Sequence, residues 1–230
     1  MIRVPNAAGS DMSAYMALPI AGKGAGVVVV QEIFGVTASM KKICDFLASR
    51  QFTVICPDLY WNVEPDADIS ESNAEKARGL RMKMNDDAVV KDIGAAVAFL
   101  RKHPACTGDV GVVGYCWGGM LAFLTAADQK PDAAVSYYGV GIEKHLDKAD
   151  KLSCPMLLHY GGQDTFAGPE AVAKVKDALK GKDAKIFEYP DAGHAFARPD
   201  GAHYHHKSAD VADMRTLSFL VETLVGKRRA

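Results

Sequence analysis

Short runs of apolar, often β-branched residues alternate along the chain with segments whose apolar positions recur every three or four residues. The runs are typical of strands buried on both faces of a sheet, and they lie at Val27–Val30, Phe52–Cys56, Val110–Val113, Ala133–Tyr138, Pro155–Tyr160 and Lys185–Tyr189. The segments between and after them have helical spacing, with apolar residues at Met40, Ile43, Phe46 and Leu47; at Val89, Val90, Ile93, Val97 and Leu100; over Met120–Ala126; at Val172, Val175 and Leu179; and at Val211, Met214, Leu217, Leu220 and Leu224. This alternation predicts an α/β fold, a mostly parallel central sheet with helices on both faces.

Two segments depart from the alternation. Ile2–Pro5 and Ser13–Leu18 are separated by small, turn-forming residues, which predicts an antiparallel pair at one edge of the sheet. Asn62–Glu75 is rich in Asp, Glu, Ser and Pro, and is too short to separate two domains. We expect it to form a surface excursion at the carboxyl end of the Phe52–Cys56 strand, where open α/β sheets bind ligands. With no internal repeat, residues 1–230 are expected to form one domain.

Composition and charge exclude several classes of function. The chain has 230 residues, 49% of them hydrophobic, and a chain of this size buries roughly 70 to 75% of the surface that it exposes when unfolded. Its 27 Lys and Arg against 28 Asp and Glu give a net charge of −1, so we expect neither nucleic acid nor an anionic membrane as a partner. No apolar run approaches the ~18 residues of a membrane span.

The cysteines indicate a reducing compartment. There are five of them, an odd number without a C-x-x-C pair, at Cys44, Cys56, Cys106, Cys116 and Cys154. This pattern argues against both a disulfide framework and a zinc knuckle. We therefore expect a cytoplasmic protein, and ask whether one cysteine is present for its chemistry.

Cys116 stands in the sharpest local motif of the chain. The sequence Gly-Tyr-Cys-Trp-Gly-Gly over 114–119 directly follows the Val110–Val113 strand and directly precedes a helical segment. A nucleophile between two glycines in such a strand–turn–helix context is typical of a strained elbow, since Cβ atoms at the glycine positions would collide. The helix N-terminus there favours a thiolate and, beside it, an oxyanion.

Two further residues supply the partners that such a nucleophile needs. Asp164 follows the Pro155–Tyr160 strand and His194 follows the Lys185–Tyr189 strand. The order nucleophile, acid, histidine is the one used by α/β-hydrolases, and all three residues fall at the carboxyl edge of the predicted sheet. His194 would act as base and then as acid, while Asp164 would orient the imidazole.

Six motifs, in order along nearly the whole chain, resemble those of the dienelactone hydrolase (carboxymethylenebutenolidase) family of the α/β-hydrolase superfamily. They are Gln-Glu-Ile-Phe-Gly-Val at 31–36, Cys-Pro-Asp-Leu-Tyr at 56–60, the cysteine motif at 114–119, Tyr-Tyr-Gly-Val-Gly at 137–141, Gly-Gly-Gln-Asp at 161–164 and Ala-Gly-His-Ala-Phe-Ala-Arg at 192–198. The resemblance implies a Cys116–His194–Asp164 triad and an α/β-hydrolase fold.

The resemblance also assigns roles around the nucleophile. It implies an oxyanion hole made by the backbone N–H groups of Ile33 and Trp117. It implies that Glu32 pairs with the Cys116 thiol in the resting enzyme and takes its proton when substrate binds. A neighbouring carboxylate opposes ionisation of a thiol, so this pairing would mask the nucleophile until it is needed.

Substrate recognition is where the sequence departs from the family. Arg198 matches a family arginine that holds the substrate carboxylate, and a guanidinium suits bidentate recognition. A second such arginine falls at Ala74 in this chain. Arg78 and Arg81 stand where the family has aromatic residues, and they either replace the missing charge, change the substrate preference or form a solvated helix face.

Other candidates carry less chemistry. His203, His205 and His206 have no carboxylate or cysteine at metal-ligand spacing, so we expect a surface loop there rather than a metal site. Tyr137 is a candidate for the pocket wall. No motif implies a cofactor.

The sequence therefore predicts an esterase-type hydrolase that opens the enol-lactone ring of dienelactone to maleylacetate through a cysteine thioester. The alternative is a carboxylesterase or thioesterase acting on another carboxylate-bearing ester or lactone. A non-catalytic binding protein would have no need of the full triad. We expect a monomer, with a homodimer as the alternative.

Overall fold

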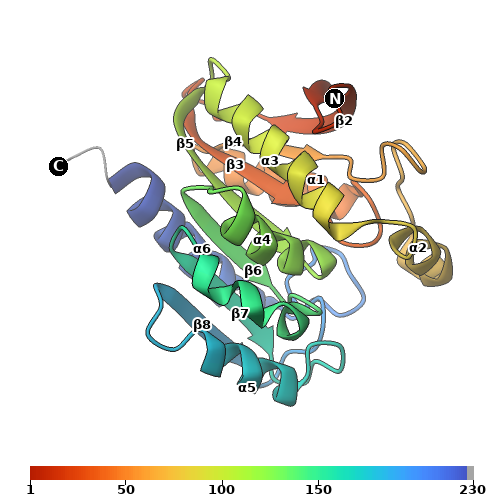
Figure 1. The fold of residues 1–230 in the computed structure, drawn as a ribbon, viewed down its shortest axis with the longest axis vertical. Coiled ribbons are helices and arrows are strands. Elements are labelled where there is room, and N and C mark those ends of the chain that lie inside the picture. Colours follow the sequence, from red (N-terminus) through yellow and green to blue (C-terminus); the bar gives the residue numbers. More distant parts are fainter. Residues whose placement is uncertain (227–230) are drawn as a thin grey trace.

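The computed structural model describes residues 1–226, and an eight-stranded sheet with the order β1-β2-β4-β3-β5-β6-β7-β8 runs through its centre. β1 and β2 are antiparallel to their neighbours, and the other strands pair in parallel. Helices lie on both sides of the sheet (Figure 1). The predicted fold class and the antiparallel edge are confirmed.

The element bounds extend several of the predicted segments. The strands are β1 (Ile2–Pro5), β2 (Asp11–Ala17), β3 (Gly24–Val30), β4 (Thr53–Pro57), β5 (Cys106–Tyr115), β6 (Ala133–Tyr137), β7 (Met156–Gly161) and β8 (Ala184–Tyr189). The helices are α1 (Ala38–Ser49), α2 (Ala74–Arg81), α3 (Asp86–Lys102), α4 (Trp117–Asp128), α5 (Pro169–Ala178) and α6 (His206–Leu220), which continues as a π-helical turn at Val221–Val225.

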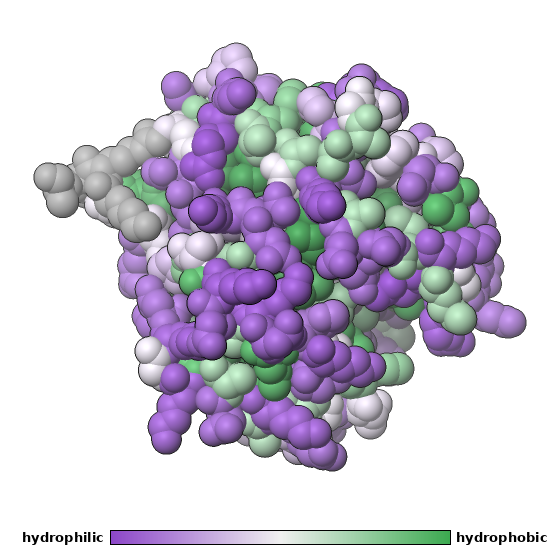
Figure 2. Space-filling view, in the orientation of Figure 1, coloured by the Kyte–Doolittle hydropathy of each residue, from purple (hydrophilic) through white to green (hydrophobic). Residues whose placement is uncertain are grey.

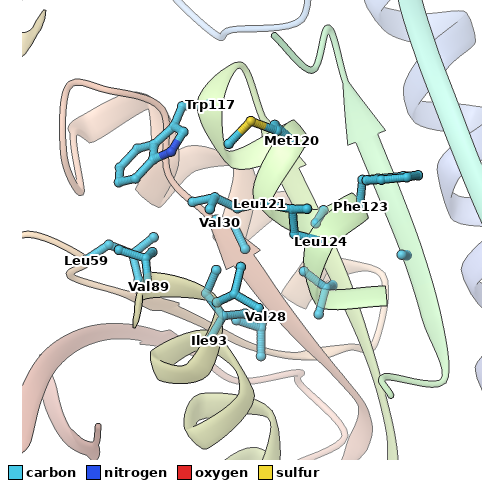
Figure 3. Packing of buried hydrophobic residues seen from close by; sticks show 14 of the residues in the cluster. Val28, Val30, Leu59, Val89, Ile93, Trp117, Met120, Leu121, Phe123 and Leu124 are labelled. Atoms are coloured by element: carbon cyan, nitrogen blue, oxygen red, sulfur yellow. The ribbon is translucent and has the colours of Figure 1, made fainter. Parts of the chain in front are cut away.

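Successive side chains of the central strands point alternately into two hydrophobic clusters, one on each face of the sheet. Val28 and Val30 pack with residues of α3 and α4, as Figure 3 shows, whereas Val27 and Val29 pack with residues of α1 and α6. All four valines are fully buried. Because both faces are covered, β3 is a continuous apolar run rather than an alternation of apolar and polar residues.

The segment 62–75 is less of a surface excursion than its composition predicts. A bridge joins Asp68 to Gly35, and the N–H of Ile69 donates to the carbonyl of Phe34 at 2.9 Å. Ala67 and Ile69 are buried. The few apolar residues of the segment thus fasten it to the loop after β3, and its polar majority hides this from a reading of composition.

On the face of the molecule shown in Figure 2, apolar residues lie in small groups separated by polar ones. Within residues 1–226, no helix combines the length and apolar character needed to cross a membrane.

Candidate active site

Cys116 sits at a strained turn between β5 and α4. Its backbone has φ 56° and ψ −118°, a left-handed conformation that costs a non-glycine residue about 1 to 3 kcal/mol. The neighbouring glycines make the turn possible, since a Cβ on Gly114 would lie 1.8 Å from the carbonyl oxygen of Gly118, and one on Gly118 would lie 2.4 Å from that of Val30. The turn presents the thiol at the N-terminus of α4, beside the ends of the parallel strands.

The structure brings Cys116, His194 and Asp164 into one hydrogen-bonded chain. His194 Nε2 lies 3.2 Å from Cys116 Sγ, and His194 Nδ1 lies 2.8 Å from Asp164 Oδ2. The other oxygen of Asp164 accepts the backbone N–H groups of Phe166 and Ala167, at 2.7 and 3.0 Å. The loops after β7 and β8 therefore hold Asp164 and His194 within hydrogen-bonding distance of one another and of Cys116.

The surroundings of His194 favour the charged form of its imidazole. Burial opposes the charge on His194, but hydrogen bonds to Asp164 and Cys116 outweigh it and raise the pKa to about 10. Burial likewise opposes ionisation of Asp164, yet the bond from His194 and two backbone N–H groups keep the pKa of that carboxyl below its ordinary value. At neutral pH the imidazolium can thus stabilise a thiolate at Cys116 and later give up a proton.

Two backbone N–H groups near the thiol are available to an oxyanion. Within residues 1–226, neither the N–H of Ile33 nor that of Trp117 has a hydrogen-bond acceptor. Tyr60 fixes the first of these residues, because its hydroxyl donates to the Ile33 carbonyl at 2.9 Å and its ring stacks on Trp117 with centroids 5.7 Å apart.

Glu32 does not bond to the thiol in this structure, contrary to the pairing implied for the resting enzyme. Its Oε2 accepts from Arg198 Nε at 2.5 Å, and its Oε1 is buried without a hydrogen-bond partner. Arg198 Nη1 also lies 2.8 Å from Glu71 Oε1. A guanidinium is a stronger partner than a thiol for a buried carboxylate, because the hydrogen bond joins opposite charges. The thiol of Cys116 is hydrogen-bonded to His194 instead.

The two arginines of α2 differ in their surroundings. Arg81 pairs with Asp86 at 2.7 Å and lies over the ring of Trp117, whose indole N–H donates to the same carboxylate at 2.9 Å. Arg81 is thus a support for Trp117. Arg78 is exposed and has no acidic partner in the described part of the chain.

These groups surround one pocket of about 670 Å³. Cys116 and His194 lie in its wall together with apolar side chains and several basic ones. The cations are Arg78, Arg81, Lys144 and Arg198, with Glu71 and Asp86 as the acidic members; His145, His203 and Ala74 also line the pocket. The volume suits a small organic substrate.

Some predicted residues lie elsewhere. Tyr137 does not line this pocket: its ring is fully buried on the α6 side of the sheet, where its hydroxyl bonds to Asp213 and Thr216 at 2.9 and 2.7 Å. Of the three histidines, His205 caps α6 and His206 begins it, so the predicted surface loop is shorter than expected. Among residues 1–226, no cluster of acidic, histidine and cysteine side chains could hold a metal.

Sequence reasoning missed several polar members of the site, among them Glu71, Asp86, Lys144 and His145. They stand in polar stretches typical of a solvated surface, and nothing in their neighbourhood resembles a catalytic motif. For Glu71 alone there was a signal, its location, because segment 62–75 was expected at the ligand-binding edge of the sheet.

Comparison with known proteins identifies the family of the chain. The model of the dienelactone hydrolase family matches residues 12–224. A carboxymethylenebutenolidase of Pseudomonas sp. strain P51 is 38% identical over 92% of this chain and 90% of its own. One of Cupriavidus pinatubonensis is 34% identical over 95% of each chain.

A solved structure extends the comparison. A Klebsiella pneumoniae protein, described as a candidate dienelactone hydrolase, superposes with a TM-score of 0.85 at 30% identity, covering 96% of each chain. Sequence, fold and family model agree over nearly the whole length. The chain is therefore a hydrolase of the dienelactone hydrolase family, with the α/β-hydrolase fold.

Proposed function

We propose that the protein opens the enol-lactone ring of dienelactone, giving maleylacetate, with Cys116 as nucleophile. The observation that carries this proposal is the bonded chain Cys116–His194–Asp164 at a strained elbow inside a pocket lined by cations. The name carboxymethylenebutenolidase, borne by relatives that cover nine-tenths of the chain, supports the substrate.

The reaction begins with attack of the Cys116 thiolate on the lactone carbonyl. Collapse of the tetrahedral intermediate breaks the ring C–O bond, and the imidazolium of His194 protonates the departing enol oxygen. The product remains attached as a thioester. His194, now neutral, removes a proton from water, which attacks the thioester carbonyl and releases both the acid and the thiolate.

The oxyanion formed in each half-reaction lies between the N–H groups of Ile33 and Trp117. Donors fixed in place before reaction stabilise charge as it develops, and removing one such donor typically costs about 100- to 1,000-fold in rate. The bond from Tyr60 to Ile33 and the position of Trp117 at the start of α4 support this role.

Arg198 and Arg78 are the proposed anchors for the substrate carboxylate. Both line the pocket, and Arg78 has no competing acidic partner in residues 1–226. In this mechanism His194 already holds the Cys116 proton, so Glu32 is not needed to accept it and is proposed instead to hold Arg198 in place through their buried hydrogen bond.

A second candidate is hydrolysis of another carboxylate-bearing ester, thioester or lactone. One feature of the pocket lining favours this second candidate. Ala74 lies where the family has an arginine, and Arg78, one turn further along α2, supplies the positive charge instead. That shift of a cation would move the carboxylate relative to the thiol.

Steady-state kinetics separate the two candidates. The cis and trans isomers of dienelactone are compared with p-nitrophenyl acetate and a p-nitrophenyl ester bearing a free carboxylate. We expect kcat/KM for one lactone isomer to exceed kcat/KM for either ester by at least about tenfold. Brisk turnover of the anionic ester without lactone turnover would support the second candidate instead, and Cys116→Ala controls for background hydrolysis.

A further inference from the structure

The guanidinium of Arg198 is held by two carboxylates at once. Glu32 binds Nε at 2.5 Å, and Glu71 binds Nη1 at 2.8 Å. One positive charge therefore faces two negative ones, so the Arg198 guanidinium is already neutralised at the place proposed for a substrate carboxylate. It gains little from an incoming anion unless one of the two carboxylates leaves.

Glu71 occupies one of the two terminal nitrogens of Arg198 that a bidentate ligand needs. A carboxylate that binds a guanidinium end-on uses both terminal nitrogens. Nη1 is occupied by Glu71, and Nε by Glu32. An external carboxylate that forms two parallel hydrogen bonds with the terminal nitrogens must therefore compete with Glu71 for Nη1.

Of the two partners, Glu71 is the exchangeable one. The Glu32 side chain is 3% exposed, whereas that of Glu71 is 35% exposed. Glu71 is the first residue of a three-residue 3-10 turn and lines the pocket directly. A partly exposed carboxylate is rehydrated when it leaves an ion pair, whereas a buried carboxylate would be left without either a partner or water.

The backbone around Glu71 nevertheless holds this residue close to Arg198. The backbone bonds of segment 67–69 to the loop after β3 place Glu71 two residues beyond a fixed point. Gly201 leaves the space for it, since a Cβ there would lie 3.0 Å from Arg198 Cδ and 3.1 Å from Glu71 Oε1. The contact is thus framed on two sides by main chain.

We propose that Glu71 is an internal stand-in for the substrate carboxylate, which an anionic ligand must displace from Arg198. Competition from Glu71 would thereby weaken the binding of all anionic ligands. It would weaken it least for ligands whose carboxylate makes two hydrogen bonds to the guanidinium. The inference rests on the proposed role of Arg198 in substrate binding.

The test measures a simple dicarboxylate rather than the lactone, so that it does not depend on lactone turnover. Succinate is titrated as a competitive inhibitor of p-nitrophenyl acetate hydrolysis by the wild type, Glu71→Gln and Glu75→Gln. Glu75 is exposed, lies on the same segment and does not line the pocket, so its variant removes an equal charge nearby.

We expect the inhibition constant of succinate to fall about three- to tenfold in Glu71→Gln and to stay unchanged in Glu75→Gln. Calorimetric titration of succinate reads the same affinities without turnover. The proposal would be overturned if the inhibition constant of succinate were unchanged in Glu71→Gln, or if succinate bound neither the wild type nor Glu71→Gln. A raised constant accompanied by a lower Tm would also overturn it, because it would show that Glu71 only props Arg198.

Discussion

Glu32 and Arg198 are 166 positions apart in the chain, and their buried side chains meet in a 2.5 Å hydrogen bond. The pair joins the loop after β3 to the loop after β8, and Arg198 lines the pocket that contains Cys116. The charge that governs substrate binding is therefore local, although the chain as a whole is nearly neutral.

Replacement of the nucleophile should separate catalysis from folding. Cys116→Ala removes the thiol and should lower kcat/KM by at least about 1,000-fold, while its Tm stays within a few degrees of the wild type because the side chain is only partly buried. Steady-state kinetics with thermal unfolding check both. Retained turnover would rule out thiolate attack.

The elbow should tolerate no side chain at Gly114. In Gly114→Ala the new Cβ meets the carbonyl oxygen of Gly118 at 1.8 Å, so the turn must shift, and we expect a loss of more than about 3 kcal/mol of unfolding free energy. Gly79→Ala is the matched control. Its Cβ meets nothing within 4 Å on α2, and we expect a gain of about 0.5 to 1 kcal/mol. Chemical denaturation measures both.

The raised pKa of His194 should make stability depend on pH. The pKa is about 10 when folded and about 6.5 in the unfolded chain, so the charged imidazole contributes its full stabilisation below pH 6.5. This contribution declines between pH 6.5 and 10, as the unfolded state loses its proton first. The Tm advantage of the wild type over His194→Gln should shrink over that window. A constant difference would contradict the charged pair.

The bond between His194 and Cys116 should also appear in alkylation rates. An unassisted thiol is only about 3% thiolate at pH 7, so iodoacetamide should modify Cys116 about tenfold more slowly in His194→Gln than in the wild type. Peptide mass analysis assigns the modified cysteine.

Glu32→Gln provides the contrasting case in the same experiment. Masking of the thiol by Glu32 would make this variant react faster than the wild type. Equal rates would agree with the structure, in which Glu32 binds Arg198 instead.

Arg198 should discriminate by substrate charge. Arg198→Ala should raise KM for carboxylate-bearing substrates about tenfold more than for neutral esters. The ratio of the two KM values is the relevant measurement, because the substitution also leaves Glu32 buried without its partner and lowers stability. Equal effects on both substrate classes would remove Arg198 from the recognition of the carboxylate.

The amino-acid sequence by itself determined the elements and the order of the catalytic residues. Periodicity is a local property, and so is the glycine pattern around Cys116 that a strained turn requires. Because parallel strands end at one edge of a sheet, residues placed just after β5, β7 and β8 had to meet there. This is why the sequence could predict that Cys116, Asp164 and His194 lie together, as they do in the structure.

Only the tertiary structure decided which face and which partner each side chain took. Tyr137 lies on a strand with both faces buried, so no alternation of polarity showed that it points away from the pocket. The partners of Arg198 come from distant loops, and many carboxylates could have competed for it. Their selection depends on the packing that fastens segment 62–75 to the loop after β3, a long-range effect with no local signature.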